Sequence, residues 1–299
     1  MLILQNVIKN FNRTTAVDNL SFEVPGGSIF GLLGPNGAGK TTTIRMIMNI
    51  LKPDSGTISF KGEPFTRGDY QKIGYLPEER GLYQKMKLKE TIVYLGRLKG
   101  LSGTKAAKQT DEFLERFELT NYANRKIEEL SKGNQQKVQF IVSIIHDPIL
   151  LILDEPFAGL DPVNQLVLKD IIGELKDKGA TIIFSTHQME QVEKLCNEIC
   201  LINNGKKILY GNLREIKKEY GTQVVTIKFE GGKETLKDLK SLRNLCLEDK
   251  SLTGEIPEGM LLNDILIEVM NHVSVTHFHL LEPSLEQIFI DQVKGGDRK

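Results

Sequence analysis

The segment Gly34-Pro-Asn-Gly-Ala-Gly-Lys40-Thr41 decides the fold, because it fits the pattern G-x-x-x-x-G-K-[ST]. The apolar run Ser28–Leu33 precedes it and predicts a buried strand, and Thr41–Leu51 predicts a helix that ends before Pro53. In such a strand–loop–helix unit, the glycines let backbone N–H groups turn toward phosphate oxygens, and the helix N-terminus adds positive partial charge. The alternative, a glycine-rich turn without a ligand, is disfavoured by the flanking strand and helix.

The loop predicts a pocket for a nucleoside polyphosphate. Lys40 is expected to reach the β- and γ-phosphates, and the Thr41 hydroxyl is expected to hold Mg²⁺. The residues expected to bind ATP here are Gly34, Pro35, Asn36, Gly37, Ala38, Gly39, Lys40, Thr41 and Thr42.

A second aliphatic run, Ile149–Leu153, predicts a strand buried on both faces that ends in Asp154-Glu155. In open α/β sheets ligands bind at the carboxyl edge of the strands, so both acids are expected beside the phosphate loop. Asp154 is predicted to hold Mg²⁺ through a water, and Glu155 to polarise an attacking water as general base. The alternative is a strand end with solvated acids.

Composition narrows the class of protein. The 299 residues carry 39 Lys+Arg against 39 Asp+Glu, and this neutral balance argues weakly against a nucleic-acid partner, so none is expected. Three cysteines do not make a disulfide framework, which favours a reducing compartment. The longest apolar region, Phe140–Leu153, is interrupted well short of the roughly 20 residues that a spanning helix needs. Any membrane role therefore requires a partner.

The remaining patterns predict two domains, 1–221 and 222–299. In the first, strands are expected at Leu2–Val7, Leu20–Val24, Thr57–Lys61, Ile73–Leu76 and Thr181–Ser185, a helical subdomain at about 84–148, a helix from Asp161-Pro162 to Gly179, and a hairpin formed by Ile199–Ile202 and Lys206–Tyr210. In the second, strands are expected at Gln223–Phe229, Ile265–Met270 and His277–Leu281, and helices at Leu236–Arg243 and Pro283–Val293.

With these motifs in place, residues 1–220 resemble the ATP-binding subunit of an ABC transporter. Leu130-Ser-Lys-Gly-Asn-Gln135 stands at the position of the LSGGQ signature, and Ala158-Gly-Leu-Asp161 resembles the D-loop. Ser185-Thr-His187 matches the strand end with the switch histidine, and Ile73-Gly-Tyr-Leu-Pro-Glu78 matches the Q-loop region. Phe11 stands where the family has an aromatic residue that stacks on adenine; its alternative is a core aromatic.

The resemblance implies an α/β fold of the P-loop NTPase, ABC type: a mixed central sheet, an antiparallel β lobe and a helical subdomain, followed by a small C-terminal α+β domain. It implies that His187 contacts the γ-phosphate, and that the signature residues of one subunit, Ser131, Lys132, Gly133 and Asn134, bind the γ-phosphate held by the opposite subunit. In the family the phosphate loop and the signature lie on opposite edges of a subunit, so the resemblance implies a head-to-tail homodimer, or a heterodimer with a related subunit. Ser131 also suits a helix N-cap, and both roles can hold.

Two positions depart from the family pattern. Glu78 replaces the usual Q-loop Gln; a carboxylate can still ligate Mg²⁺, but it adds negative charge near Glu155 and the phosphates. Lys132 replaces a signature Gly, and Asn134 replaces the Gln. Lys132 either pairs with phosphate or remains a solvated side chain.

The predicted function is ATP binding and hydrolysis that power a transmembrane permease, with ATP and Mg²⁺ as cofactors. The subunit is expected to be cytoplasmic and peripheral on the inner face of the cell membrane through that permease, coupled to it by the segment Glu78–Tyr83 and the helical subdomain. Tyr75–Tyr83 and Leu281–Phe289 resemble sodium-extrusion-type subunits, which favours export. The alternatives are a soluble ABC ATPase not coupled to transport, and an ATP-gated binding switch with little turnover.

Overall fold

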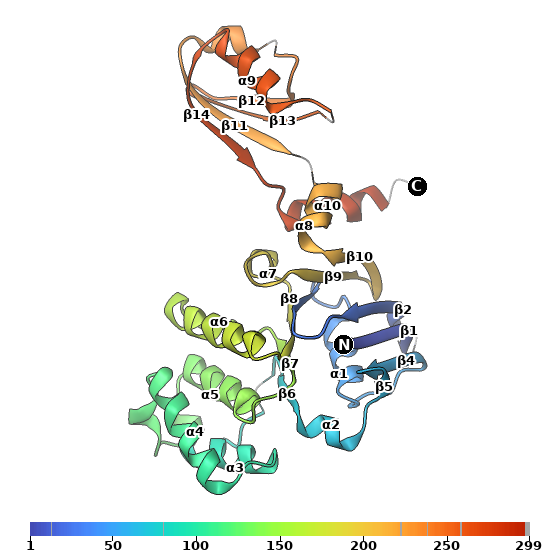
Figure 1. Cartoon of the computed structure of the whole chain (residues 1–299), viewed down its shortest axis with the longest axis vertical. Coiled ribbons are helices and arrows are strands. Elements are labelled where there is room, and N and C mark those ends of the chain that lie inside the picture. Colours follow the sequence, from blue (N-terminus) through green and yellow to red (C-terminus); the bar gives the residue numbers. More distant parts are fainter. Residues whose placement is uncertain (13, 80, 222, 238, 258, 297–299) are drawn as a thin grey trace. The chain divides into compact units, whose positions relative to one another are not determined.

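The computed structural model describes residues 1–296 apart from 13, 80, 222, 238 and 258, and it divides into two compact units, Met1–Leu213 and Arg214–Lys299 (Figure 1). Helix α8 (Leu213–Tyr220) begins at this division. The division therefore precedes the expected boundary between residues 221 and 222 by one short helix.

A six-stranded mixed sheet forms the centre of the first unit, in the order β10-β9-β3-β8-β7-β6. Its strands are β3 (Ile29–Leu33), β6 (Ile73–Leu76), β7 (Leu150–Asp154), β8 (Thr181–Thr186), β9 (Glu198–Asn203) and β10 (Lys206–Asn212). The strands pair in parallel except for the β9–β10 hairpin. Strands β3, β7 and β8 are buried along their whole length, as expected for parallel strands covered on both faces. Since parallel strands end at one edge, Asp154 at the end of β7 pairs with Ser185 of β8.

A separate antiparallel sheet, in the order β2-β1-β4-β5, packs against the central sheet. It comprises β1 (Leu2–Phe11), β2 (Thr14–Val24), β4 (Ser55–Phe60) and β5 (Glu63–Pro64). Helix α1 (Lys40–Ile47) joins both sheets in one hydrophobic core, in which Ile44 and Ile47 are fully buried with Leu4 of β1 and Ile152 of β7. The predicted mixed sheet and antiparallel lobe are therefore both found.

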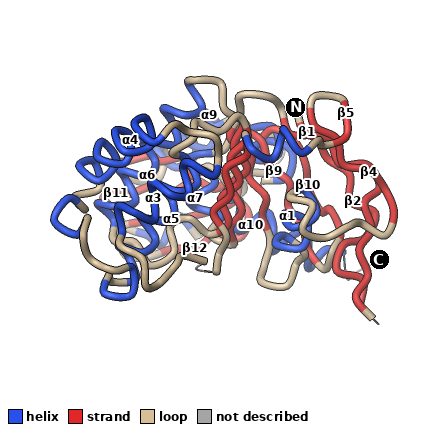
Figure 2. The backbone as a smooth tube through the Cα atoms, turned by 90° about the horizontal axis from the view of Figure 1, so that it is seen from below, coloured by secondary structure: helices blue, strands red, loops and turns tan. Residues whose placement is uncertain are grey.

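Helices occupy the opposite side of this unit. Figures 1 and 2 show α3, α4, α5 and α6 gathered on one side of the central strands, with β1, β2, β4 and β5 on the other. Besides α1, the α-helices of the unit that lie wholly before residue 213 are α2 (Arg67–Gln71), α3 (Leu88–Leu98), α4 (Gly103–Arg116), α5 (Lys132–Ile144), α6 (Pro162–Asp177) and α7 (Met189–Leu195). Among the described residues, no helix has both the length and the apolar character needed to cross a membrane.

The second unit is a four-stranded antiparallel sheet, β12-β13-β11-β14, with helices α9 (Leu262–Met270) and α10 (Leu285–Gly296). Its strands are β11 (Val224–Glu230), β12 (Arg243–Leu247), β13 (Ser251–Glu255) and β14 (Ser274–Leu281). Ile227 and Phe229 of β11 are buried in one core with Ile265 and Val269 of α9.

Two predictions in this unit are wrong. The expected strand Ile265–Met270 is helix α9, in which Ile265 and Val269 are buried one turn apart while Ile267 is exposed. A short apolar run does not distinguish the two structures by periodicity. The expected helix Leu236–Arg243 is also absent from the described residues, where a 3-10 turn ends at Leu236 and β12 begins at Arg243.

Candidate functional site

The loop between β3 and α1 has a backbone that only glycine fits at two positions. Gly34 has φ 148°, and a Cβ there would lie 2.1 Å from the Ile202 carbonyl oxygen. Gly39 has φ 106°, and its Cβ would lie 2.5 Å from the Ala16 carbonyl oxygen. The loop therefore presses against β9 and β2 while turning into α1, which leaves its inner side open to a ligand.

Lys40, the first residue of α1, has a buried side chain that folds back over the loop. Its Nζ donates to the carbonyl oxygens of Gly34 (2.7 Å) and Pro35 (3.2 Å). Burial lowers the pKa of Lys40, and the negative charges of Glu155 and other nearby carboxylates oppose that shift. These two hydrogen bonds hold the ammonium over the loop.

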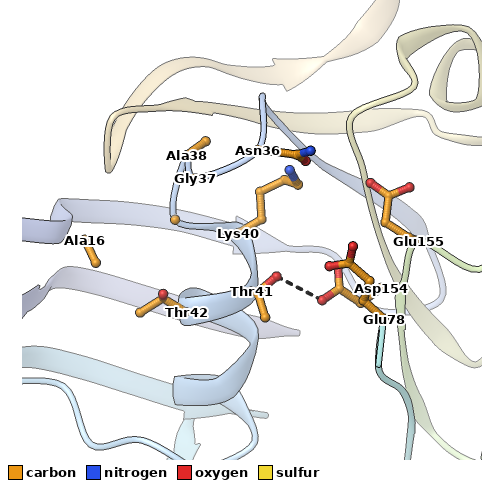
Figure 3. A pocket seen from close by; sticks show the side chains of 11 residues that line it. Ala16, Asn36, Gly37, Ala38, Lys40, Thr41, Thr42, Glu78, Asp154 and Glu155 are labelled. Carbon is orange, nitrogen blue, oxygen red and sulfur yellow. Dashed lines mark hydrogen bonds between the residues drawn. The ribbon is translucent and has the colours of Figure 1, made fainter. Parts of the chain in front are cut away.

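A pocket of about 360 Å³ opens over this loop (Figure 3). Its carboxylates come from three places: the segment after β6, the end of β7 and the residue that follows β7. It is lined by Ala16, Asn36, Gly37, Ala38, Gly39, Lys40, Thr41, Thr42, Glu78, Asp154 and Glu155. Among these residues three carboxyl groups face one ammonium group, a balance that suits a bound divalent cation.

Asp154 is held by two hydroxyl groups. The Thr41 hydroxyl donates to Asp154 Oδ2 (3.1 Å, the dashed line in Figure 3), and the Ser185 hydroxyl donates to Oδ1 (2.8 Å). Burial raises the pKa of Asp154, and these two hydrogen bonds oppose the shift. Hydroxyl and carboxylate oxygens are the ligands that Mg²⁺ prefers, so Thr41, Asp154 and the nearby Glu78 fit this cation.

Glu155 follows the strand in the left-handed region, with φ 49°. Its carboxylate accepts hydrogen bonds from the Thr186 hydroxyl (2.8 Å) and from the backbone N–H of His187 (2.9 Å). The ring Nδ1 of His187 lies 2.6 Å from Glu155 Oε1. Three contacts from the end of β8 thus fix the carboxylate of Glu155. A left-handed backbone at a residue other than glycine is typical of functional positions.

Phe11 lies at the end of β1 and is 44% exposed, which excludes its reading as a core aromatic. The Lys9 ammonium lies 5.6 Å from the centre of its ring. The exposed ring is accessible to a ligand, although Phe11 does not line the phosphate pocket.

The signature and D-loop residues also lie outside the lining of the phosphate pocket. Ser131 is the N-cap of α5 and accepts from the backbone N–H of Asn134 (3.2 Å), while Asp161 is the N-cap of α6. Lys132 is exposed. A Cβ on Gly133 would lie 3.3 Å from the Gly159 carbonyl oxygen, so the start of the signature helix and the D-loop approach each other closely within the chain.

Sequence reasoning missed several residues of this site. Ala16 lines the pocket, and sequence reasoning did not place it there. The signal that could have indicated it is Gly39, because a glycine at that position allows another segment of backbone, here that of Ala16, to approach closely. The hydroxyl groups of Ser185 and Thr186 hold the two acids, but their contacts depend on the pairing of β7 with β8.

A loop shaped for phosphates, a hydroxyl–carboxylate pair suited to Mg²⁺ and a fixed carboxylate at a strand end define the site of a nucleoside triphosphatase. Comparison with known proteins names the family. The ABC transporter family model matches residues 17–158, and the model for the C-terminal domain of DrrA1-3-like ATP-binding proteins matches residues 211–293.

Individual relatives agree. The chain is 46% identical to the ABC transporter ATP-binding protein YhaQ of Bacillus subtilis (strain 168), over 98% of both chains. It is 38% identical to the Nod factor export ATP-binding protein I of Burkholderia lata, over 75% of each chain. A solved ATP-binding subunit of an ABC transporter is 31% identical with a TM-score of 0.69, covering 74% of this chain and 93% of that one.

The chain therefore belongs to the ATP-binding proteins of ABC transporters. It is an ATPase subunit that binds ATP and powers a membrane permease, and the predicted α/β fold of this family is confirmed.

Proposed function

We propose that the pocket over the β3–α1 loop holds ATP with Mg²⁺. The observation that carries this proposal is the Thr41–Asp154 hydrogen bond (3.1 Å) in a pocket that also presents the Lys40 ammonium. Lys40 and the N–H groups of residues 36–42 bind the phosphates, and Phe11 stacks on the base. Thr41, Glu78 and Asp154 hold Mg²⁺, which neutralises developing charge on the phosphate oxygens.

In the proposed hydrolysis Glu155 orients the attacking water and receives its proton on a carboxylate oxygen. Thr186 and His187 hold that carboxylate in place, which removes the need to reorganise it at the moment of reaction. Since the Nδ1 of His187 faces Glu155, Nε2 is the ring atom left to contact the γ-phosphate.

The second face of each ATP comes from the partner subunit in a head-to-tail dimer, as a homodimer or with a related subunit. Ser131, Lys132, Gly133 and Asn134 supply a helix N-terminus and one ammonium group that their own phosphate pocket does not use. Asp161 would lie beside the same interface, because the D-loop approaches the signature helix. ATP then stabilises the closed dimer, and hydrolysis releases it.

The permease would bind near the segment that follows Glu78. Tyr83, Tyr94 and Leu98 are 44–60% exposed, and the two tyrosine rings meet edge to face with centroids 6.1 Å apart. This exposed apolar group is suited to a protein partner, which would place the subunit on the cytoplasmic face of the cell membrane. Export is the proposed direction, because one relative is named for Nod factor export. Residues from α8 onward would form the accessory α+β domain.

The test is phosphate release by the purified chain, compared with Glu155→Gln and with Glu112→Gln, an exposed glutamate on α4. We expect the first variant to lose at least about a hundredfold in rate and the second to keep the wild-type rate. An equal rate for Glu155→Gln would refute its role as base. Gentle-detergent purification from membranes should also recover a polytopic membrane protein in stoichiometric amount, and its absence would refute the permease partner.

A further inference from the structure

The signature helix α5 carries a buried glutamine at its centre. Gln139 is 5% exposed, and its Nε2 donates to the carbonyl oxygens of Pro77 (3.2 Å) and Glu79 (3.1 Å). These carbonyls stand on either side of Glu78. Because both acceptors are carbonyl oxygens, only the NH₂ end of the amide can face them, which fixes its orientation.

The described part of the segment that Gln139 contacts has few backbone hydrogen bonds of its own. Strand β6 ends at Leu76, and Pro77 has no backbone N–H to donate. Among the described residues, residues 77–79 make no backbone–backbone hydrogen bond outside regular elements. The two bonds from Gln139 therefore hold the backbone on both sides of Glu78 where such bonds are scarce.

The oxygen of Gln139, which is unpartnered in the described part of the chain, indicates that this position is a glutamine for the hydrogen bonds of its NH₂ group. The Oε1 atom of Gln139 is buried and has no hydrogen-bond partner among the described residues. A buried acceptor without a partner is unfavourable, so an apolar side chain of similar size would suit a purely structural position. What the amide supplies, and an apolar side chain cannot, is the pair of bonds around Glu78.

We propose that Gln139 is a positioning residue that holds Glu78 at the Mg²⁺ site and ties the Glu78 segment to the signature helix. Glu78 lines the phosphate pocket beside Asp154, and a residue that orients a metal ligand controls metal affinity without touching the metal. This step rests on the proposed function, in which Glu78 ligates Mg²⁺.

Helix α5 also connects this contact to the signature residues and to the segment that carries Glu155. Helix α5 runs without a break from Lys132 to Ile144, with Ser131 as its N-cap. One turn before Gln139, the buried Gln136 donates to the Pro156 carbonyl oxygen (3.3 Å), directly after Glu155. A displacement of α5 on engaging the partner's phosphate would thus move the Glu78 segment with it.

The first test measures hydrogen exchange of the segment 77–83 in Gln139→Leu and, should that variant not fold, Gln139→Met. The control is Gln109→Leu: Gln109 also has a buried Oε1 without a partner among the described residues, but its Nε2 donates to Asp147 (3.2 Å), which is not in segment 77–83. We expect exchange in segment 77–83 to rise about tenfold in the Gln139 variants and to stay unchanged in the control. Unchanged exchange would overturn the proposal.

The second test measures Mn²⁺ binding in the presence of ADP by electron paramagnetic resonance, which needs no turnover. Gln139→Leu should weaken Mn²⁺ binding about tenfold, and should weaken it no further when Glu78→Ala is already present. Wild-type affinity in Gln139→Leu, or an equal added loss in the double variant, would overturn the positioning role. If Glu78→Ala alone leaves Mn²⁺ affinity intact, the proposed metal ligand is wrong, while the exchange test still decides the contact between Gln139 and the segment.

Discussion

His146, between α5 and β7, should make the stability of the first unit depend on pH. Its Nε2 donates to the Ile73 carbonyl oxygen (3.2 Å), which also accepts from Lys99, and its Nδ1 is buried with no partner among the described residues. Burial, with the nearby Lys99 charge, lowers the pKa of His146 from about 6.5 to about 4, and the Ile73 hydrogen bond and Asp147 oppose the shift.

A base whose pKa is lower in the folded state contributes stability above its unfolded pKa and loses it as pH falls toward the folded value. One pKa unit corresponds to about 1.4 kcal/mol, so the full contribution of neutral His146 is about 3 kcal/mol. Between about pH 7.5 and pH 5.5 about 1.4 kcal/mol of it should be lost, a tenfold change in the folding equilibrium.

The assay is urea unfolding followed by circular dichroism for the wild type and for His146→Gln, whose amide can still donate to Ile73. The free energy of unfolding of the wild type should fall relative to that of the variant by about 1.4 kcal/mol over this pH range. A difference that stays constant from about pH 7.5 to pH 5.5 would refute the reasoning, because it would show that His146 titrates equally in the folded and unfolded chains.

Three further variants test the nucleotide site. Lys40→Ala should weaken ATP binding about a hundredfold, because a charge-assisted hydrogen bond is lost; titration with a fluorescent analogue measures this, and affinity within threefold of wild type would contradict it. Thr186→Val removes a donor to Glu155 at 2.8 Å, so phosphate release should fall about tenfold with unchanged ATP affinity; an affected affinity would point to a binding role. Gly133→Ala should change the free energy of unfolding by no more than about 1 kcal/mol but reduce ATP-dependent dimerisation, since the added Cβ would lie 3.3 Å from the Gly159 carbonyl oxygen of the D-loop. Analytical ultracentrifugation with ATP, with Glu155→Gln also present to prevent hydrolysis, measures dimerisation, and a dimer as stable as that of Glu155→Gln alone would refute this prediction.

Local patterns predicted most of the first unit because its elements carry strong, short-range signals. The run Leu150–Leu153 is aliphatic at every position, which suits a strand buried on both faces, and β7 is such a strand. Asp161-Pro162 predicted a helix start, and Asp161 is the N-cap of α6. The loop and strand patterns predicted that Lys40, Thr41 and Asp154 lie close together, and Figure 3 shows them around one pocket.

The second unit was harder to predict because its signals are weak or ambiguous. Strands β12 and β13 have five residues each, and both were missed. Residues 265–270 are mostly apolar and could form a strand or one face of a helix; only packing against β11 shows which. Contacts that join distant segments were equally invisible, since Gln139 and Glu79 are 60 positions apart.

The two departures from the family pattern, Glu78 in the Q-loop and Lys132 in the signature, both change the charge around the bound phosphates. Glu78 gives the described pocket lining three carboxyl groups against the single ammonium of Lys40, so the pocket is less favourable to a polyphosphate than one with an amide at that position. Mg²⁺ can offset this charge only if Glu78 is held where it can ligate the metal, and the Gln139 contacts hold the backbone on both sides of it. In the proposed dimer Lys132 adds a cation from the opposite side. Helix α5 thus supplies two groups that offset the added carboxylate of Glu78: the positive charge of Lys132 at its first residue and the amide of Gln139 two turns later, which positions Glu78.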